Sequence, residues 1–135
     1  MRRRPKIGLA LGSGSARGWA HIGAIRALEE RGVRPDIVCG TSIGALVGAF
    51  YASGDLDNLE QWVTSLTWTT VVRLMDLTWR GGFIRGARVF DLFRRNFEER
   101  EIQALPVTYG AVATELASGR ELWLREGKIF DAVRA

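Results

Sequence analysis

The sequence predicts an α/β domain with a mainly parallel sheet, and its first half carries this prediction. A short apolar run over residues 7–11 is followed by a glycine-rich loop, a helical pattern and a second apolar run that starts at Ile37. Two neighbouring parallel strands need a long crossover connection, which is usually a helix, whereas antiparallel strands can be joined by a short turn. The helical pattern between the two runs therefore indicates a parallel pair. Such connections are right-handed in nearly all proteins, so the unit begins a sheet with a helix on one face. A total of 135 residues fits one domain or part of one.

The first helix is expected over residues 19–31. Its small residues recur at helical spacing, at Ala20, Gly23, Ala24 and Ala27, and Gly32 provides a C-terminal cap. Because the side chains on this face are small, the helix can approach a sheet closely.

The eighteen residues from Ile37 to Gly54 carry no charge, a length that raises the question of a membrane span. Glycines and hydroxyl residues near the front of this run indicate a turn instead. We therefore expect a strand over 37–39, a tight turn, and a helix over 43–53. The helix is apolar nearly all round, so it should be buried in the centre of the domain.

Further elements follow the central helix in the predicted fold. They are a helix capped by Asp55 or Asp57, a less regular stretch over 68–86, an amphipathic helix over 87–97, paired strands over 107–116 and 121–127, and a helix from Lys128. The alternation of small and β-branched residues indicates the first of the paired strands, and the sequence ASGR indicates the turn after it.

The net charge is +4 and the isoelectric point about 10.0, with arginine supplying almost all of the positive charge. The guanidinium group suits phosphates and carboxylates, so charge alone leaves anionic lipids, membrane surfaces and nucleic acid open as partners. A genomic bias toward arginine codons would give the same composition. Cys39 is the single cysteine, which excludes an internal disulfide and fits a reducing compartment.

The pentapeptide GTSIG over 40–44 places Ser42 between a predicted strand and an apolar helix. This is the context that a nucleophile elbow requires. Gly40 and Gly44 would relieve crowding where the chain turns, leaving the Ser42 hydroxyl exposed. The amides at the start of the helix would favour negative charge that develops nearby.

The loop GSGSARG over 12–18 also joins a strand to a helix, and it allows two interpretations. As a nucleotide site it gives GxGxxxG, one residue away from the dinucleotide pattern, with Asp36 near the position of the ribose-binding acid. As an oxyanion hole it needs only one or two backbone amides directed at Ser42, with Arg17 adding positive charge. The second interpretation uses both glycine loops at once.

A base for Ser42 is not evident in the sequence. His21 is the only histidine, and it precedes the serine, whereas the histidine of elbow hydrolases comes last in the chain. We expect it to support the loop. A carboxylate must then be considered as the base, and Glu115, at the end of a predicted strand, is the candidate to test, although a structural role suits it better.

These motifs resemble, in order and spacing, the patatin-like phospholipase family, particularly its short bacterial branch. The resemblance begins with GLALGSGSARGWAHIGAIRALEERG, continues through GTSIGALVGAFYASG, and ends with GAVATELASGRELWLREGKIFDAVRA, so it covers essentially all 135 residues. It implies a three-layer α/β/α fold with a mainly parallel central sheet, and hydrolysis of the acyl esters of lipids by a Ser–Asp dyad.

The resemblance also implies roles for residues of both loops. They are Ser42 as nucleophile, Gly40 and Gly44 as elbow, Gly14, Ser15 and Ala16 as oxyanion hole, and Arg17 and Gly18 as support. The family motif GGGxRG falls on SGSARG, with serine at two glycine positions. Ser15 keeps its amide, but it must adopt dihedral angles that glycine adopts more easily.

The family's aspartate stands in a DGG or DGA motif, and this sequence contains no Asp-Gly pair. Because the last helical pattern also stops without a cap, we expect the 135 residues to be an N-terminal portion of a patatin-like domain without its general base. A catalytically incomplete lipid- or anion-binding or regulatory module is the alternative.

The implied partners are a lipid or other acyl ester as substrate, with no nucleic acid and no metal or organic cofactor. We expect a cytoplasmic location, with contact to the inner face of the membrane as an open question. The aromatic and arginine-rich stretch 62–83 is the candidate for such contact. Packing of these rings beneath a loop is the competing interpretation.

Overall fold

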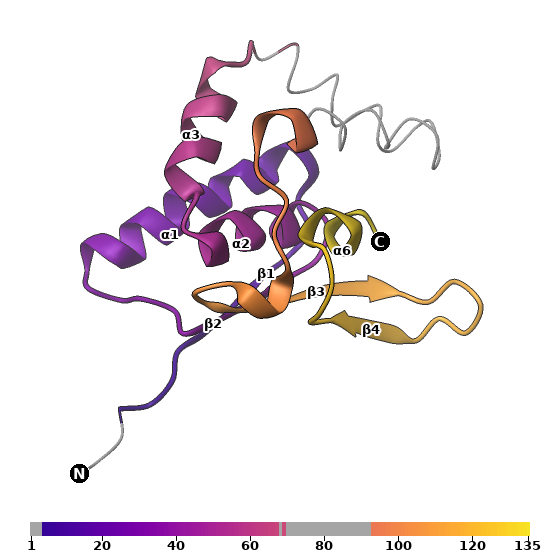
Figure 1. The fold of residues 1–135 in the computed structure, drawn as a ribbon. Coiled ribbons are helices and arrows are strands. Elements are labelled where there is room, and N and C mark those ends of the chain that lie inside the picture. Colours follow the sequence, from indigo (N-terminus) through magenta and orange to yellow (C-terminus); the bar gives the residue numbers. More distant parts are fainter. Residues whose placement is uncertain (1–3, 68, 70–92) are drawn as a thin grey trace.

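The computed structural model describes residues 4–67, 69 and 93–135 (Figure 1). Its elements in chain order are β1 (Gly8–Leu11), the 3-10 helix η1 (Ser15–Trp19), α1 (Ala20–Glu30), β2 (Ile37–Gly40), α2 (Ile43–Ser53), α3 (Leu56–Ser65), the 3-10 helix η2 (Ile102–Ala104), β3 (Thr108–Thr114), β4 (Glu121–Leu124) and α6 (Ile129–Arg134). The helix expected over 87–97 and the stretch 68–86 lie largely outside the described residues.

The strands form one sheet in the order β1-β2-β3-β4. The first three strands are parallel, and β4 is antiparallel to β3. In this register Leu11 pairs with Gly40, and Gly40 pairs with Ala111. The predicted mainly parallel α/β fold is therefore confirmed. Because the carboxyl ends of β1 and β2 meet at one edge, the two glycine loops that follow them are neighbours.

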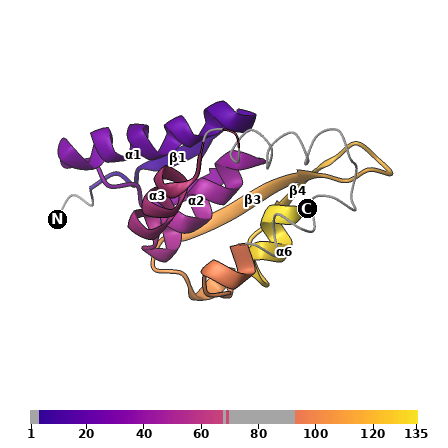
Figure 2. The same ribbon diagram turned by 90° about the horizontal axis from the view of Figure 1, so that it is seen from above.

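Helix α2 is the buried centre of the fold, as its sequence predicts. Its Val47 and Ala52 side chains have no exposed surface. The Tyr109 hydroxyl of β3 donates a hydrogen bond of 2.7 Å to the Ala45 carbonyl, and burial raises the pKa of this hydroxyl. Figure 2 shows α2 lying over the sheet between α1 and α6. Within the described part of the chain, no helix combines the length and the apolar character that crossing a membrane requires.

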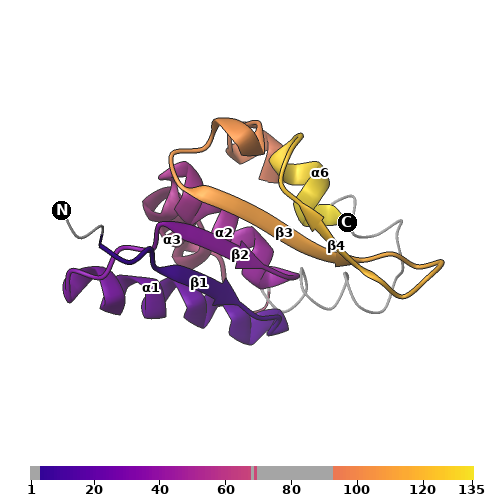
Figure 3. The ribbon, with the colours of Figure 1, turned by 90° about the horizontal axis from the view of Figure 1, so that it is seen from below.

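Helices α1, α2, α3 and α6 lie on one face of the sheet, above it in Figure 1. In the view of Figure 3, α2 and α3 lie behind β2 and β3. Residues that point to the other face are correspondingly open to solvent: Ile37 is 39% exposed and Trp123 is 45% exposed. The described residues thus supply the sheet and one helical layer of the α/β/α arrangement.

Aromatic rings fill the space between α2, α3 and the segment that starts at residue 93. The centroids of Phe50 and Phe97 are 4.5 Å apart, and those of Trp62 and Phe93 are 4.9 Å apart. For Trp62 this supports packing within the core rather than an exposed lipid contact. The remaining part of the aromatic stretch, except residues 63–67 and 69, lies outside the described residues.

Ion pairs replace the side-chain cap expected for α3. Asp55 occupies the N-cap position, but its side chain makes no capping hydrogen bond, and its carboxylate lies 3.5 Å from Arg100. Asp57 instead joins Glu60 around the Arg26 guanidinium, whose distance to Glu60 is 2.9 Å. The two ion pairs of Arg26 hold α3 against α1.

Asp36 fixes the entry into β1. Its carboxylate accepts hydrogen bonds from the Ile7 amide (2.9 Å) and the Arg4 guanidinium (2.7 Å). The bond from the Ile7 amide, aided by the charge of Arg4, lowers the pKa of this carboxyl. Asp36 precedes β2 and so lies at the sheet edge opposite the glycine loops, which argues against the dinucleotide interpretation.

We predict that Asp36→Asn destabilises the protein at neutral pH and that its effect disappears in acid. Because the folded-state pKa is lowered, the ionised carboxylate contributes stability above its ordinary value of 3.8. That contribution is lost as the pH falls through the lowered folded-state value. Urea unfolding of both proteins across this range measures the difference in free energy, and a pH-independent difference would contradict the assignment.

Candidate active site

Ser42 lies at the point where β2 turns into α2, and its backbone is strained. Its φ is 54° and its ψ is −127°, outside the left-handed well that non-glycine residues normally use at positive φ. Such a conformation costs about 1–3 kcal/mol and persists only where the surroundings enforce it. The side chain is exposed, as the sequence predicts for a nucleophile elbow.

The surroundings that enforce this turn are the two elbow glycines. A Cβ atom at Gly40 would overlap the Gly44 carbonyl and lie 2.7 Å from the Ala45 nitrogen. A Cβ atom at Gly44 would overlap the carbonyl oxygen that ends β1 at Leu11. Glycine at both positions lets α2 start in close contact with the ends of two strands.

The loop over 12–18 is seated against the same turn. A Cβ atom at Gly18 would overlap the side chain of Ile43, so this glycine allows η1 to pack on the first residue of α2. Ser15 has a φ of 49°, which shows that serine adopts the left-handed conformation expected of this position. The Arg17 amide donates to the Gly14 carbonyl at 3.0 Å, and the Arg17 side chain is exposed.

The first residues of these two helices carry backbone amides that have no partner in the regular helical hydrogen-bond pattern. Ser15 and Ala16 begin η1, and Ile43 begins α2. The sequence argument omits Ile43, although the residue after the nucleophile supplies an oxyanion-hole amide in elbow hydrolases. Its position directly after Ser42 is the signal that identifies it.

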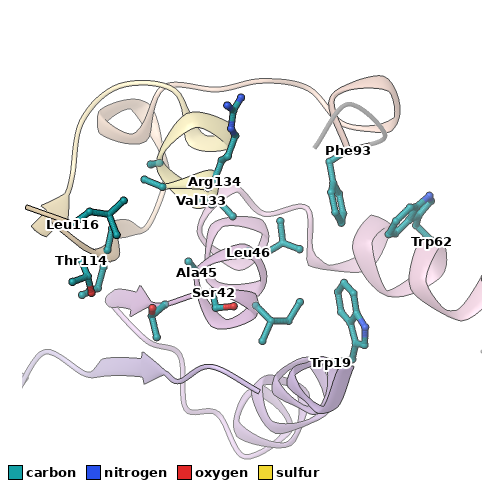
Figure 4. A pocket seen from close by; sticks show the side chains of 16 residues that line it. Trp19, Ser42, Ala45, Leu46, Trp62, Phe93, Thr114, Leu116, Val133 and Arg134 are labelled. Atoms are coloured by element: carbon teal, nitrogen blue, oxygen red, sulfur yellow. The ribbon is translucent and has the colours of Figure 1, made fainter. Parts of the chain in front are cut away.

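A cavity of about 410 Å³ opens beside Ser42 (Figure 4). Thr41 and Ser42 contribute to its wall, which is otherwise mainly apolar and includes Trp19, Ile43, Leu46, Trp62, Phe93 and Val133. Figure 4 shows the Ser42 side chain among these groups, with Leu46 and Val133 across from it. The structure thus brings Ser42 to an apolar cavity, whereas Gly14, Ser15 and Ala16 do not line it.

No aspartate or glutamate side chain is among the described residues that line this cavity. Glu115 lies in the turn after β3, where its carboxylate accepts a hydrogen bond from the Ser118 hydroxyl and is exposed. Its contacts fit the structural role. Asp76 and Asp91 lie outside the described residues. Among the residues that the structure describes, no group of histidine, cysteine, aspartate or glutamate could hold a metal ion.

His21 supports the glycine loop, as the sequence argument expects. Its Nε2 atom lies 2.8 Å from the Gly12 carbonyl oxygen. A carbonyl oxygen only accepts hydrogen bonds, so Nε2 carries the proton and donates it. This nitrogen therefore cannot take a proton from Ser42 in the arrangement observed.

A strained serine between a parallel strand and a buried helix is the backbone arrangement of the α/β hydrolase elbow. The fold and the site therefore define an α/β protein in which a serine occupies a sharp turn from a parallel strand into a helix. Residues 9–135 match the family model described as patatin-like phospholipase. The chain belongs to the patatin-like phospholipase family.

Curated relatives support the same assignment. An uncharacterised NTE family protein of Mycobacterium bovis is 43% identical over 132 residues, which cover 97% of this chain and 37% of the relative. Patatin-like phospholipase domain-containing protein 6 of Mus musculus is 35% identical over 135 residues, covering 96% of this chain and 10% of the relative. The chain thus spans little more than a third of the length of its mycobacterial relative.

We predict that Gly44→Ala lowers the free energy of unfolding by about 3 kcal/mol, because its methyl group would displace backbone rather than side chains. Gly23→Ala is the matched control, since the added methyl group would meet no atom within 4 Å apart from the backbone of its own helix and the adjacent residues. In α1 that substitution should stabilise by up to about 1 kcal/mol. Urea unfolding followed by circular dichroism measures both, and a Gly44→Ala protein as stable as wild type would contradict the packing argument.

A second prediction concerns the strain at Ser42. Both Ser42→Gly and Ser42→Ala remove the hydroxyl, but only glycine relaxes the positive φ, so the glycine variant should be more stable by roughly 1–3 kcal/mol. At Gln61, exposed on α3, the order should reverse, with alanine favoured by about 1 kcal/mol. Thermal and urea unfolding of the four variants tests this, and equal stability of the two Ser42 variants would show that residue 42 is unstrained.

Proposed function

We propose that the protein is a serine acyl hydrolase acting on lipid esters, with Ser42 as its nucleophile. The strained Ser42 backbone beside an apolar cavity is the observation that carries this proposal. A residue held in such a conformation at a turn is typical of functional sites, because the strain must be maintained by the fold. Family membership supports the same chemistry.

In this mechanism the Ser42 hydroxyl attacks the ester carbonyl and forms a tetrahedral intermediate. Negative charge develops on the carbonyl oxygen and would be stabilised by the amides of Ser15, Ala16 and Ile43. The positive end of the α2 dipole lies at Ile43, next to Ser42, and would also stabilise this negative charge. The seating of Gly18 on Ile43 supports this arrangement by keeping the two helix starts together.

The cavity would hold the acyl chain of the substrate. Its volume of about 410 Å³ lies within the range typical of small-molecule sites, and its apolar wall suits a hydrocarbon. Arg134 is the one charged side chain among the described lining residues. An acyl group bound along this wall would present its ester carbonyl to Ser42.

The general base is proposed to be the family's aspartate, supplied from outside these 135 residues. It would take the Ser42 proton, pass it to the alcohol as the carbon–oxygen ester bond breaks, and then activate water. Attack of that water on the acyl-serine ester releases the fatty acid and restores Ser42. No metal or organic cofactor takes part in this scheme.

A catalytically incomplete lipid-binding or regulatory module is the second candidate. The observation in its favour is the lack of an aspartate or glutamate side chain among the described residues around Ser42. Under this proposal the cavity binds acyl chains without cleaving them. Under either function we propose a cytoplasmic location, with peripheral contact to the inner face of the membrane.

The test compares the 135-residue chain with a form extended through a DGG or DGA segment. We predict p-nitrophenyl ester hydrolysis and fluorophosphonate labelling in the extended form, with the label on Ser42. Ser42→Ala should abolish labelling and lower kcat/KM by about 10⁴-fold or more, whereas Ser118→Ala should change neither, because Ser118 does not line the cavity. Inactivity of both the short and the extended forms would contradict the hydrolase proposal and favour the binding module.

A further inference from the structure

The imidazole of His21 reaches from α1 to the first carbonyl of the glycine loop. Its donated hydrogen bond to Gly12 is 2.8 Å long and spans nine positions of the sequence. The residue lies in the first turn of α1, directly after η1. The His21 side chain therefore links the first residue of the loop 12–18 to the helix that follows this loop.

The Gly12 carbonyl is also part of the contact between the loop and the elbow. A Cβ atom at Gly44 would lie 2.5 Å from this oxygen, so the α2 backbone passes close beside it. The neighbouring Leu11 carbonyl accepts a hydrogen bond of 3.2 Å from the Thr41 amide. The carbonyl that His21 holds thus lies beside Gly44, and the carbonyl before it is bonded to Thr41, so two consecutive peptide groups of the loop contact the two sides of the Ser42 turn.

We propose that His21 is a positioning residue that fixes the amides of Ser15 and Ala16 relative to Ser42. The inference rests on the proposed hydrolase function. Rotation of the Gly12 peptide would move the start of η1, and with it the amides proposed above to stabilise the oxyanion. His21 holds that peptide in one orientation by donating its Nε2 proton to Gly12, a role that requires no proton transfer to or from Ser42.

The experiment measures ester hydrolysis in the extended protein with three substitutions at this position. His21→Ala should lower kcat/KM by roughly 10- to 100-fold through kcat, because a small displacement of catalytic groups has effects of this size, while KM is unchanged. His21→Gln should restore most of the activity, since its amide N–H extends about as far as Nε2. His21→Asn, which is too short to reach Gly12, should behave like His21→Ala.

Two further readouts separate positioning from general destabilisation or base catalysis. A trifluoromethyl ketone, whose adduct with serine carries an oxyanion, should lose affinity for His21→Ala by the same factor as kcat/KM. The pH–rate profile of His21→Gln should keep the shape of the wild-type profile. Arg31→Ala, which removes a 3.1 Å bond to the Ala27 carbonyl at the other end of α1, serves as the control.

Wild-type kinetics in both His21→Ala and His21→Asn would overturn the inference. A fall in kcat/KM for His21→Gln as large as that for His21→Ala would also overturn it. Loss of one limb of the pH–rate profile in His21→Gln would also overturn it and indicate a base. These outcomes differ from failure of the proposed function, in which the wild-type extended protein is itself inactive or Ser42→Ala stays active. Should His21→Ala fail to fold, the comparison of the Asn and Gln variants decides alone.

Discussion

The backbone of α2 begins against the carbonyl groups that end β1, and this close approach constrains the geometry around Ser42. It requires glycine at 44, where any side chain would meet Leu11, and glycine at 40, where it would meet Gly44. With the helix held there, the chain has only two residues in which to pass from β2 into α2. The positive φ of Ser42 is the consequence, so the strain comes from packing of the sheet against the central helix.

Polar contacts hold the rest of the helical layer around that centre. The Arg100 guanidinium donates a 2.9 Å hydrogen bond to the Ser53 carbonyl, at the end of α2 where positive charge is favoured. Arg26 joins α1 to α3 through Glu60 and Asp57. The apolar helix is therefore fixed at its start by backbone contacts and at its end by a charge. The cavity beside Ser42 lies between the first turns of α2 and the rings of Trp62 and Phe93.

Much of this arrangement is readable from the sequence because it depends on local pattern. The turn residues at the front of the uncharged run, and Gly54 at its end, predict the limits of α2 to the residue. The polar details were less accessible, since they depend on distant partners. Asp55 and Asp57 have the chemistry of helix caps, but Arg100 and Arg26 pair with them instead. The contact of Ile43 with the loop after β1 depends on β1 and β2 being neighbours in the sheet, so local sequence pattern alone does not reveal it.

The open face of the sheet gives the single cysteine a practical meaning. Cys39 is partly exposed in β2, and it points to the same side as Ile37, away from the described helices. A thiol reagent can therefore modify the chain at one position only, in the middle of that face. The rate of this modification reports whether other polypeptide covers the sheet, so one residue can monitor the assembly of a longer form of the protein.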